Sequence, residues 1–272
     1  MVTPRQISST SNATIKEAVR LHRKRNRYQS RLFLVEGEDL LDAALAHGVI
    51  PRQVFVLEEY ESLVPEEAFT APPGGGLQTS MPEIFSCTAD VMAKLSQLAS
   101  GARVIAAFEM PNGKFPAGID GGPVLYLAGA RDPGNIGTLL RGAAAFGVKA
   151  VALGAQSADP YAAKAIRSSM GAIFQVPLYL TVNPEALVSW AEGAGVDVIC
   201  ADSHTGDLVW EAPLGGDFVL VLGSERERIP HRLKDAAALT VRIPQSEETE
   251  SINVAMAGTA ILYEAVRQRA GS

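Results

Sequence analysis

The chain has 272 residues and a formal net charge of −6, with 47% hydrophobic and 20% charged residues. This composition is typical of a folded globular protein and excludes a disordered chain, which would hold fewer apolar residues and more net charge. No apolar run is long enough to span a membrane, and the first residues lack the apolar core of a secretion signal, so we expect a cytoplasmic protein without a membrane partner.

Cysteine and histidine are too sparse to predict a disulfide framework or a metal site. The two cysteines, Cys87 and Cys200, lie far apart, and the four histidines are scattered singly along the chain. Zinc sites need clustered ligands, and a free cysteine usually behaves as a small buried apolar residue. We therefore expect no metal and two buried thiols.

The amino-terminal segment is strongly basic although the whole chain is acidic. Residues 1–35 hold eight lysines and arginines against one acid, which gives them a net charge of +7. Electrostatic fields fade over about 8 Å at physiological salt, so a polyanion responds to this local face and not to distant acids. The segment is either a solvated helix or a surface that binds RNA phosphates. The candidate RNA-binding residues are Arg20, Arg23, Lys24, Arg25 and Arg27.

The residues up to 110 predict a small α/β domain, followed by a linker. Glycines and prolines at 111–121 cannot continue regular structure, so we place the linker there. In chain order we expect a basic helix at about 12–29, a strand at 31–37, a helix at 39–48, a strand at 52–58, a loop at 71–76, a helix at 89–101 and a strand at 102–110.

Residues 122–272 alternate between continuous apolar runs and helical stretches. Such runs are typical of strands covered on both faces, so the pattern predicts a parallel sheet wrapped by helices. On the last helix, Met256 and Tyr263 lie on a stripe that is either core or subunit interface, and Gly258 permits close packing. We expect strands at 123–130, 148–155, 173–180, 196–202, 217–224 and 239–245, and helices at 134–146, 159–169, 184–194, 230–237 and 251–269.

Motifs for common cofactors and hydrolases are missing from the second domain. Gly129, Gly134 and Gly137 lack the spacing of a dinucleotide-binding loop, and Asn135 stands where a phosphate-binding loop has its lysine. No serine nucleophile elbow is present. A nicotinamide oxidoreductase and a serine hydrolase are therefore disfavoured.

Three separated segments carry a family resemblance: DPGNIGTLLRGAAAFG at 132–147, LVLGSERERIP at 220–230 and IPQSEETESINVAMAGTAILYE at 243–264. They resemble the three motifs of the SpoU/TrmH branch of the SPOUT methyltransferases. AIRSSMGAIFQVPL at 165–178 resembles the segment between the first two motifs, and residues 1–110 resemble the L30e-like substrate-binding domain often fused in front. The resemblance implies a trefoil-knotted α/β catalytic domain at 122–272.

The resemblance also implies a homodimeric enzyme that uses S-adenosylmethionine to methylate a ribose 2′-hydroxyl of RNA. Ribosomal RNA is the expected target, because the front domain resembles that of rRNA-modifying relatives. In this family Arg141 and Asn135 would orient the target ribose and phosphate against the methyl donor. The implied catalytic residues are Asn135, Arg141, Glu225 and Asn253, and the implied cofactor contacts are Leu222, Gly223, Ile243, Ser251, Ile252 and Asn253.

Structural roles stay open for several of these residues. Ser251 or Thr249 is an alternative cap for the last helix, a surface salt bridge is the alternative for Arg141, and loop support is the alternative for Glu225. A guanidinium keeps its proton, so Arg141 is expected to clamp phosphate and not to act as a base. Residues 226–228 depart from the family, which commonly has glycines there. The alternative function is a non-catalytic RNA-binding protein, which the intact motif residues disfavour.

Overall fold

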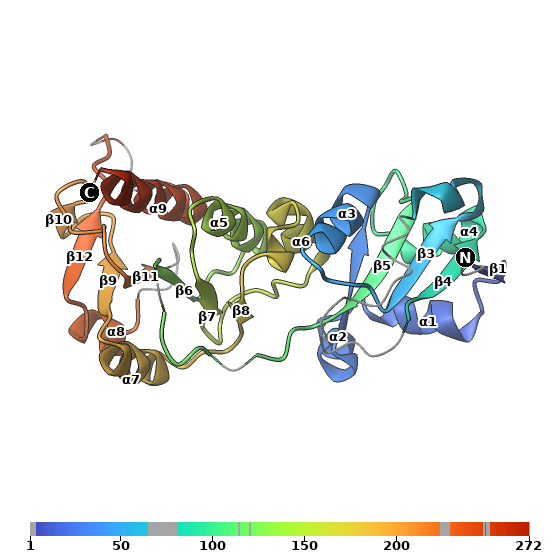
Figure 1. Ribbon diagram of the computed structural model, residues 1–272, viewed down its shortest axis with the longest axis horizontal. Coiled ribbons are helices and arrows are strands. Elements are labelled where there is room, and N and C mark those ends of the chain that lie inside the picture. Colours follow the sequence, from blue (N-terminus) through green and yellow to red (C-terminus); the bar gives the residue numbers. More distant parts are fainter. Residues whose placement is uncertain are drawn as a thin grey trace. The chain divides into compact units, whose positions relative to one another are not determined.

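The computed structural model describes residues 4–64, 81–113, 115–119, 121–223, 229–246, 248 and 251–271. The chain divides into two compact units (Figure 1). Met1–Pro111 and Tyr161–Phe174 make up the first unit, and Asn112–Pro160 and Gln175–Ser272 make up the second. The segment at 161–174 therefore packs with the first unit, although the chain on both sides of it belongs to the second.

A five-stranded sheet forms the centre of the first unit, in the order β1-β4-β3-β5-β2. β1, β4 and β3 are parallel, whereas β5 is antiparallel to both β3 and β2. The sequence pattern predicts β2, β3 and β5 but not β1 or β4. The strands are Arg5–Ile7 (β1), Leu32–Glu36 (β2), Gln53–Leu57 (β3), Glu83–Cys87 (β4) and Val104–Glu109 (β5).

Helices bury the apolar residues of this sheet. Ile15 on α1 and Leu95 on α4 belong to one buried cluster with Phe55 on β3. α3 contacts β2 and β5 instead. The helices are Ala13–Arg20 (α1), Lys24–Ser30 (α2), Glu38–Ala46 (α3) and Ala89–Leu95 (α4), with a 3-10 turn at Glu58–Leu63 (η1).

The basic segment forms two helices with a corner between them, so the expectation of one continuous helix was wrong. Arg27 is buried, and its Nη1 donates to the carbonyls of Leu21 (2.6 Å) and His22 (2.9 Å). Asn26 donates from Nδ2 to the carbonyl of Arg20 (2.9 Å). These side chains satisfy carbonyls that a longer helix would have paired internally, and they thereby hold the corner.

Aromatic rings hold the segment at 161–174 within the first unit. The ring centroid of Phe33 on β2 lies 4.7 Å from that of Tyr161, and the centroid of Phe108 on β5 lies 4.9 Å from that of Phe174. Tilted aromatic pairs at this spacing add to the free energy of ordinary apolar burial. The segment contains Ala163–Ser169 (α6) and a 3-10 turn at Ala172–Phe174 (η3).

A seven-stranded sheet forms the centre of the second unit, in the order β10-β12-β9-β11-β6-β7-β8. All of its described strand pairs are parallel, which confirms the predicted parallel α/β architecture. The short strand β10 was not expected. The strands are Val124–Ala128 (β6), Ala150–Leu153 (β7), Leu178–Tyr179 (β8), Asp197–Ala201 (β9), Asp207–Leu208 (β10), Phe218–Gly223 (β11) and Leu239–Arg242 (β12).

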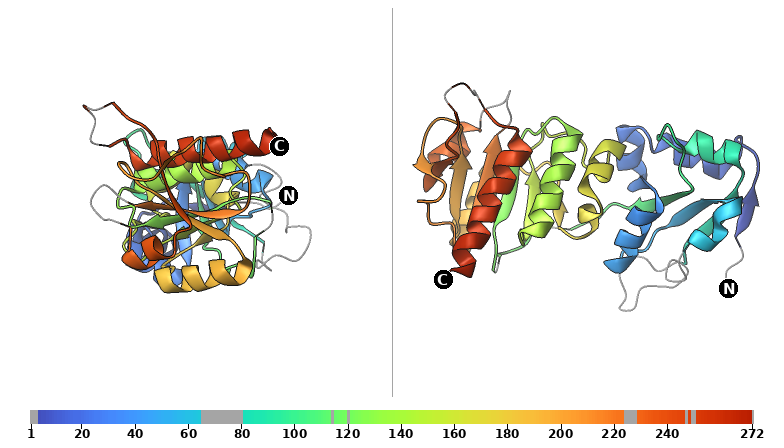
Figure 2. Two further views of the ribbon diagram at one scale, coloured as in Figure 1. Left: turned by 90° about the vertical axis from the view of Figure 1, so that its left-hand side faces the viewer. Right: turned by 90° about the horizontal axis from the view of Figure 1, so that it is seen from above.

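Helices cover both faces of this sheet, with α5 and α9 side by side on one face and α7 and α8 on the other (Figures 1 and 2). Glycine allows α9 to approach closely, because a Cβ at Gly258 would lie 2.5 Å from Leu222 Cδ1 and 2.7 Å from Leu139 Cδ2. The packing role expected of Gly258 is confirmed. The helices are Pro133–Ala145 (α5), Pro184–Ala194 (α7), His231–Asp235 (α8) and Val254–Ala270 (α9).

The segment expected to be a linker is anchored to the second unit. The ring centroid of Phe115 lies 4.9 Å from that of Tyr179 and 4.8 Å from that of Trp190, in edge-to-face geometry. Trp190 also donates from Nε1 to the carbonyl of Pro116 (2.5 Å). The described part of this segment therefore packs against the second unit.

Both cysteines are buried, as expected. Burial raises the pKa of Cys87 to about 12 and that of Cys200 to about 11, so both thiols stay protonated at neutral pH. Among the described helices none is long and apolar enough to cross a membrane. The same part of the chain holds no cluster of three histidine, cysteine or carboxylate side chains placed to bind a metal ion.

Candidate active site

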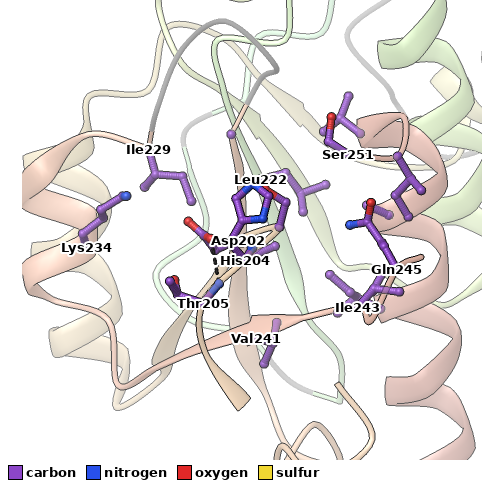
Figure 3. A pocket seen from close by; sticks show the side chains of 17 residues that line it. Asp202, His204, Thr205, Leu222, Ile229, Lys234, Val241, Ile243, Gln245 and Ser251 are labelled. Atoms are coloured by element: carbon purple, nitrogen blue, oxygen red, sulfur yellow. Dashed lines mark hydrogen bonds between the residues drawn. The ribbon is translucent and has the colours of Figure 1, made fainter. Parts of the chain in front are cut away.

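Three strand ends and one helix start surround a cavity in the second unit. β12, β9 and β11 are consecutive parallel strands, so their carboxyl ends lie at one edge of the sheet. Open α/β sheets bind ligands outside this edge. A cavity of about 580 Å³ lies there, between the loops that follow these strands and the first turns of α9 (Figure 3).

The first wall of the cavity holds five of the six residues expected to contact a cofactor, whereas the sixth, Asn253, does not line the cavity. Leu222 and Gly223 end β11, Ile243 follows β12, and Ser251 and Ile252 precede α9, and all five line the cavity. Aliphatic side chains from α9 complete this wall. Most side chains of this wall are therefore aliphatic.

The opposite wall is polar, and no sequence pattern predicts it. Asp202, His204 and Thr205 come from the loop after β9, and Lys234 comes from α8 (Figure 3). No local motif marks these residues, because they belong to a short exposed loop and a five-residue helix. Only the fold brings them to face the predicted contacts.

Asp202 organises this polar loop. Its Oδ1 accepts hydrogen bonds from the backbone N–H groups of His204 (2.9 Å) and Thr205 (3.0 Å). Partial burial by itself would raise the pKa of Asp202, but these bonds and the positive charge of Lys234 together bring it below its ordinary value. Asp202 therefore stays ionised at neutral pH and keeps the loop in a tight turn.

The residues of the cavity fit S-adenosylmethionine. Its volume lies in the range of small-molecule sites, the aliphatic wall suits a flat purine ring, and the polar wall suits hydroxyl and charged groups. Gln245 Oε1 is buried in the cavity wall and accepts no hydrogen bond from any described residue. Buried polar atoms are usually satisfied, so this one indicates a polar ligand.

The structure brings together Asn135 and Asn253, two of the predicted catalytic residues, beside this cavity. Asn253 caps α9, where its Oδ1 accepts from the Ala255 N–H (2.8 Å), and its Nδ2 donates to Asn135 Oδ1 (3.0 Å). Because each amide has one accepting and one donating end, these bonds fix the orientation of both side chains. Asn135 Nδ2 is thereby turned away from Asn253, and no described residue accepts from it.

The start of α5 is built to hold Asn135 in place. Asp132 caps this helix through a bond from the Gly134 N–H to its Oδ1 (2.8 Å), and Pro133 occupies the first helical position. Both choices are favoured at helix amino termini. Asn135 consequently lies in the first turn, where its side chain reaches the cap of α9.

Arg141 does not line the cavity. It is exposed on α5 and has no hydrogen bond or ion pair with the described residues. Arg141 follows Asn135 by six helical positions, which places it about 9 Å farther along the axis and on a different side of the helix. The surface salt bridge considered for Arg141 is therefore not formed within the described chain.

The structure cannot be compared with every residue named in the sequence analysis, because some of them are not described. Glu225 and residues 226–228 lie outside the described residues, as does Thr249. Asn253 caps α9, so the alternative in which Ser251 caps it was wrong. Ser251 is exposed at the cavity and keeps its expected place near a cofactor.

The basic segment divides into exposed and buried cations. Arg20, Arg23, Lys24 and Arg25 are exposed on α1, α2 and the corner between them, whereas Arg27 is buried and bonded to carbonyls of the corner. A guanidinium engaged in this way stabilises the fold. The exposed four are the members of the predicted set whose charge faces solvent.

Two family descriptions match this chain. The SpoU rRNA Methylase family matches residues 122–263, which is more than half of the chain. The MRM3-like substrate binding domain matches residues 12–106, in agreement with the substrate-binding domain expected in front. The two matches follow one another in the order that the sequence analysis predicted.

Individual relatives resemble the chain over most of its length. It is 29% identical to the 23S rRNA (guanosine(2553)-2′-O)-methyltransferase RlmP of Bacillus subtilis over 259 residues. The matched region covers 95% of this chain and 98% of the relative. It is 31% identical to a 23S rRNA (uridine(2479)-2′-O)-methyltransferase of Streptomyces viridochromogenes, over 71% of this chain and 70% of the relative. The crystal structure of the SpoU methyltransferase AviRb from Streptomyces viridochromogenes, in complex with the cofactor AdoMet, superposes with a TM-score of 0.81 at 28% identity, over 96% of this chain and 99% of that one.

Proposed function

The chain belongs to the SpoU rRNA methylase family and is an S-adenosylmethionine-dependent rRNA ribose 2′-O-methyltransferase, and on that premise we propose how its residues carry out the transfer. Family membership sets aside the nicotinamide oxidoreductase and the non-catalytic RNA-binding protein. The observation that supports the proposed site best is the Asn253–Asn135 hydrogen bond beside the cavity.

Positioning of the ribose is the main task of the protein. S-adenosylmethionine, when bound in the cavity, supplies an activated methyl group. A ribose hydroxyl is a weak nucleophile, so the rate depends on holding its oxygen in line with that group. Asn135 donates from Nδ2 to the ribose or to the adjoining phosphate, and Asn253 keeps this amide turned toward the RNA. Glu225, which follows β11 in the sequence, is the remaining proposed catalytic residue, on the resemblance alone.

Arg141 acts on the phosphate beside the target ribose. A guanidinium keeps its proton at any pH that the protein survives, so Arg141 stabilises charge and does not remove the hydroxyl proton. Water or the phosphate itself accepts that proton. The exposure of Arg141 and the lack of a described partner for its guanidinium support this role.

The enzyme works as a homodimer formed through α9. Met256 and Tyr263 lie seven residues apart on one side of this helix and are 65% and 58% exposed. Large apolar side chains exposed together are typical of a subunit interface. Because Arg141 lies outside the cavity of its own chain, it serves the cavity of the partner subunit. Mixed dimers would test this, since an Arg141→Ala chain and a cofactor-pocket variant should restore one active site when combined.

Residues 1–110 form the RNA-capturing domain, residues 111–121 the linker and residues 122–272 the catalytic domain. The match to a substrate-binding domain at 12–106 and the exposed cations Arg20, Arg23, Lys24 and Arg25 support this division. Cations placed in this way attract RNA phosphates without reading sequence. Residues 161–174 fall within the second range of the sequence, but they pack with the first unit.

The substrate is 23S ribosomal RNA in the cytoplasm, because the two relatives described above, from Bacillus subtilis and Streptomyces viridochromogenes, are named 23S rRNA methyltransferases. Mapping of 2′-O-methyl groups in rRNA from a strain without the gene and from its parent tests this. We expect one 23S position to lose its methyl group and to regain it with the wild-type gene but not with Arg141→Ala. Identical methylation maps would contradict the proposed substrate.

A further inference from the structure

Gln245 carries a polar atom that the protein itself does not satisfy. It lies in the loop after β12 and lines the cavity, and its Oε1 is fully buried without a hydrogen bond from any described residue. A buried acceptor without a donor lowers stability, and folded proteins rarely tolerate one without a reason. Because Gln245 lines the cavity, a turn of its side chain brings this oxygen to a ligand bound there.

Gln245 lies on the mainly aliphatic side of the cavity. Ile243 and Ile252 line the same side of the cavity, whereas Asp202 and His204 line the side opposite, as Figure 3 shows for the labelled residues. A carboxamide set among aliphatic side chains offers one acceptor and one pair of donors to a ligand that is otherwise held by apolar contact. A flat aromatic base with a polar edge can both pack against the aliphatic side chains and form hydrogen bonds with the carboxamide.

We propose that Gln245 recognises the adenine of S-adenosylmethionine by accepting a hydrogen bond from its 6-amino group. The carboxamide Nε2 then donates to the neighbouring ring nitrogen, the pairing by which glutamine reads adenine elsewhere. The other donors of the cofactor, its ribose hydroxyls and its ammonium group, are strongly hydrated and match the opposite wall, where Asp202 is ionised. Gln245 is thus a specificity residue for the base and takes no part in methyl transfer.

This inference rests on the cofactor assigned above, and calorimetry with S-adenosylhomocysteine tests the two separately. The second ligand is its analogue with purine in place of adenine, which lacks only the 6-amino group. We expect the wild-type protein to bind S-adenosylhomocysteine about 10- to 100-fold more tightly than the analogue. A wild-type protein that binds neither ligand would overturn the cofactor assignment, whereas equal affinity for both would overturn only the role of Gln245.

Two substitutions separate the hydrogen bond from the shape of the side chain. Gln245→Met keeps the length but removes the acceptor, so the two ligands should bind within about threefold of one another. Gln245→Glu keeps an acceptor, so the preference for adenine should persist even if both affinities fall. Ser246→Ala, at the exposed next position, is the control and should retain the wild-type preference. A preference that survives in Gln245→Met would overturn the proposal.

Thermal unfolding of the ligand-free variant excludes a purely structural role. Because Gln245 Oε1 has no described partner, replacement by methionine should leave the unfolding temperature unchanged or raise it. A marked fall would mean that Oε1 is bonded within the protein, and it would overturn the proposal together with its premise of an unsatisfied acceptor.

Discussion

Both ends of α9 carry a polar cluster. The clusters differ in whether all of their hydrogen-bonding groups have partners within the described chain. At the amino end, Asn253 caps the helix and orients Asn135, whose Nδ2 has no described acceptor. At the carboxyl end, both carboxylate oxygens of Glu264 accept hydrogen bonds. The first cluster is left open toward a ligand, and the second is closed.

The closed cluster fastens a surface loop to α9. Glu264 accepts from Arg267 Nε and Nη2 (both 2.7 Å) and from Gln268 Nε2 (2.8 Å). Gln268 Oε1 in turn accepts from the Leu214 N–H (2.8 Å), and its Nε2 also donates to the Ala212 carbonyl (2.9 Å). We infer that the amino end of α9, with its unsatisfied groups, serves function and that the carboxyl end, with its satisfied groups, serves stability.

Among the variants considered, Arg141→Ala should have the largest effect on turnover. Like Asn135 Nδ2, the Arg141 guanidinium has no hydrogen-bond partner among the described residues, so it is available to the RNA. Arg141→Ala should lower the turnover number about 100-fold, equivalent to about 2.7 kcal/mol of transition-state stabilisation. Affinity for S-adenosylmethionine should stay nearly the same, since Arg141 lies outside the cavity. Single-turnover assays on rRNA transcripts and calorimetry with the cofactor measure the two quantities.

An exposed arginine elsewhere gives the matched control for this experiment. Arg232 on α8 is exposed and does not line the cavity, so Arg232→Ala should retain wild-type turnover. Full activity of Arg141→Ala, or an equal loss in both variants, would contradict the assigned role.

The closed cluster should respond in stability and not in chemistry. Glu264→Gln removes the charge and places an amide donor against the Arg267 guanidinium, so the free energy of unfolding should fall by about 2 kcal/mol. Cofactor affinity and turnover of the folded protein should change little. Urea unfolding measures the effect, with the exposed Glu192→Gln as control. A variant of unchanged stability that loses activity would reverse the comparison between the two ends of α9.

The open cluster can be altered without loss of the helix cap. Asn253→Asp keeps an oxygen for the Ala255 N–H but has no donor for Asn135, whose amide should then turn its Nδ2 toward the new carboxylate. Turnover should fall about tenfold, equivalent to about 1.4 kcal/mol, with stability nearly unchanged. Asn253→Ala should lose stability as well. Wild-type turnover in Asn253→Asp would show that the orientation of Asn135 is unimportant.

The sequence predicted those elements of the fold that have a local signal, such as an apolar run or residues that favour a helix end. β6 and β11 were predicted because continuous apolar runs mark strands buried on both faces. α7 was predicted with its observed bounds, because Asn183 and Pro184 favour a helix start and Gly195 a helix end. The strands β1 and β10, of three and two residues, are too short for any period to appear. The break between α1 and α2 escaped prediction because Asn26 and Arg27 fold back to create it.

The same division applies to the site. Motif resemblance identified Leu222, Ile243 and Ile252 at the cavity, since each belongs to a segment with a recognisable order. Lys234 and Gln245 escaped prediction because their importance depends on what faces them across the cavity and not on their neighbours in sequence. The trefoil knot implied by the resemblance stays a prediction, since residues 224–228 and 249–250 lie outside the described part of the chain.

The contrast between open and closed groups extends to the basic segment of the first unit. Arg25 is exposed, whereas Arg27 is bonded to carbonyls of the corner, so the two single-charge variants form a matched pair. Arg25→Ala should weaken RNA binding about fivefold and reduce the slope of log affinity against log salt by about 0.7 to 0.9. Arg27→Ala should lower the unfolding temperature without changing that slope. Binding titrations at several salt concentrations measure this, and equal slopes for Arg25→Ala and the wild type would contradict an RNA-binding role for Arg25.

The smallest expected effect is a pH dependence that belongs to the closed cluster alone. Hydrogen bonds from Arg267 and Gln268 lower the pKa of Glu264 from its ordinary value of 4.5 to about 2. A carboxyl group whose pKa is lower in the folded state stabilises the fold above its unfolded pKa and loses this contribution as the pH falls through its folded pKa. The difference in unfolding free energy between the wild type and Glu264→Gln should therefore be constant above about pH 5 and shrink between pH 4.5 and 2. Asp202, whose pKa is also lowered, titrates in both proteins and cancels from the difference. Urea titrations across this range measure it, and a difference that does not shrink would show that the hydrogen bonds, and not the charge, make Glu264 stabilising.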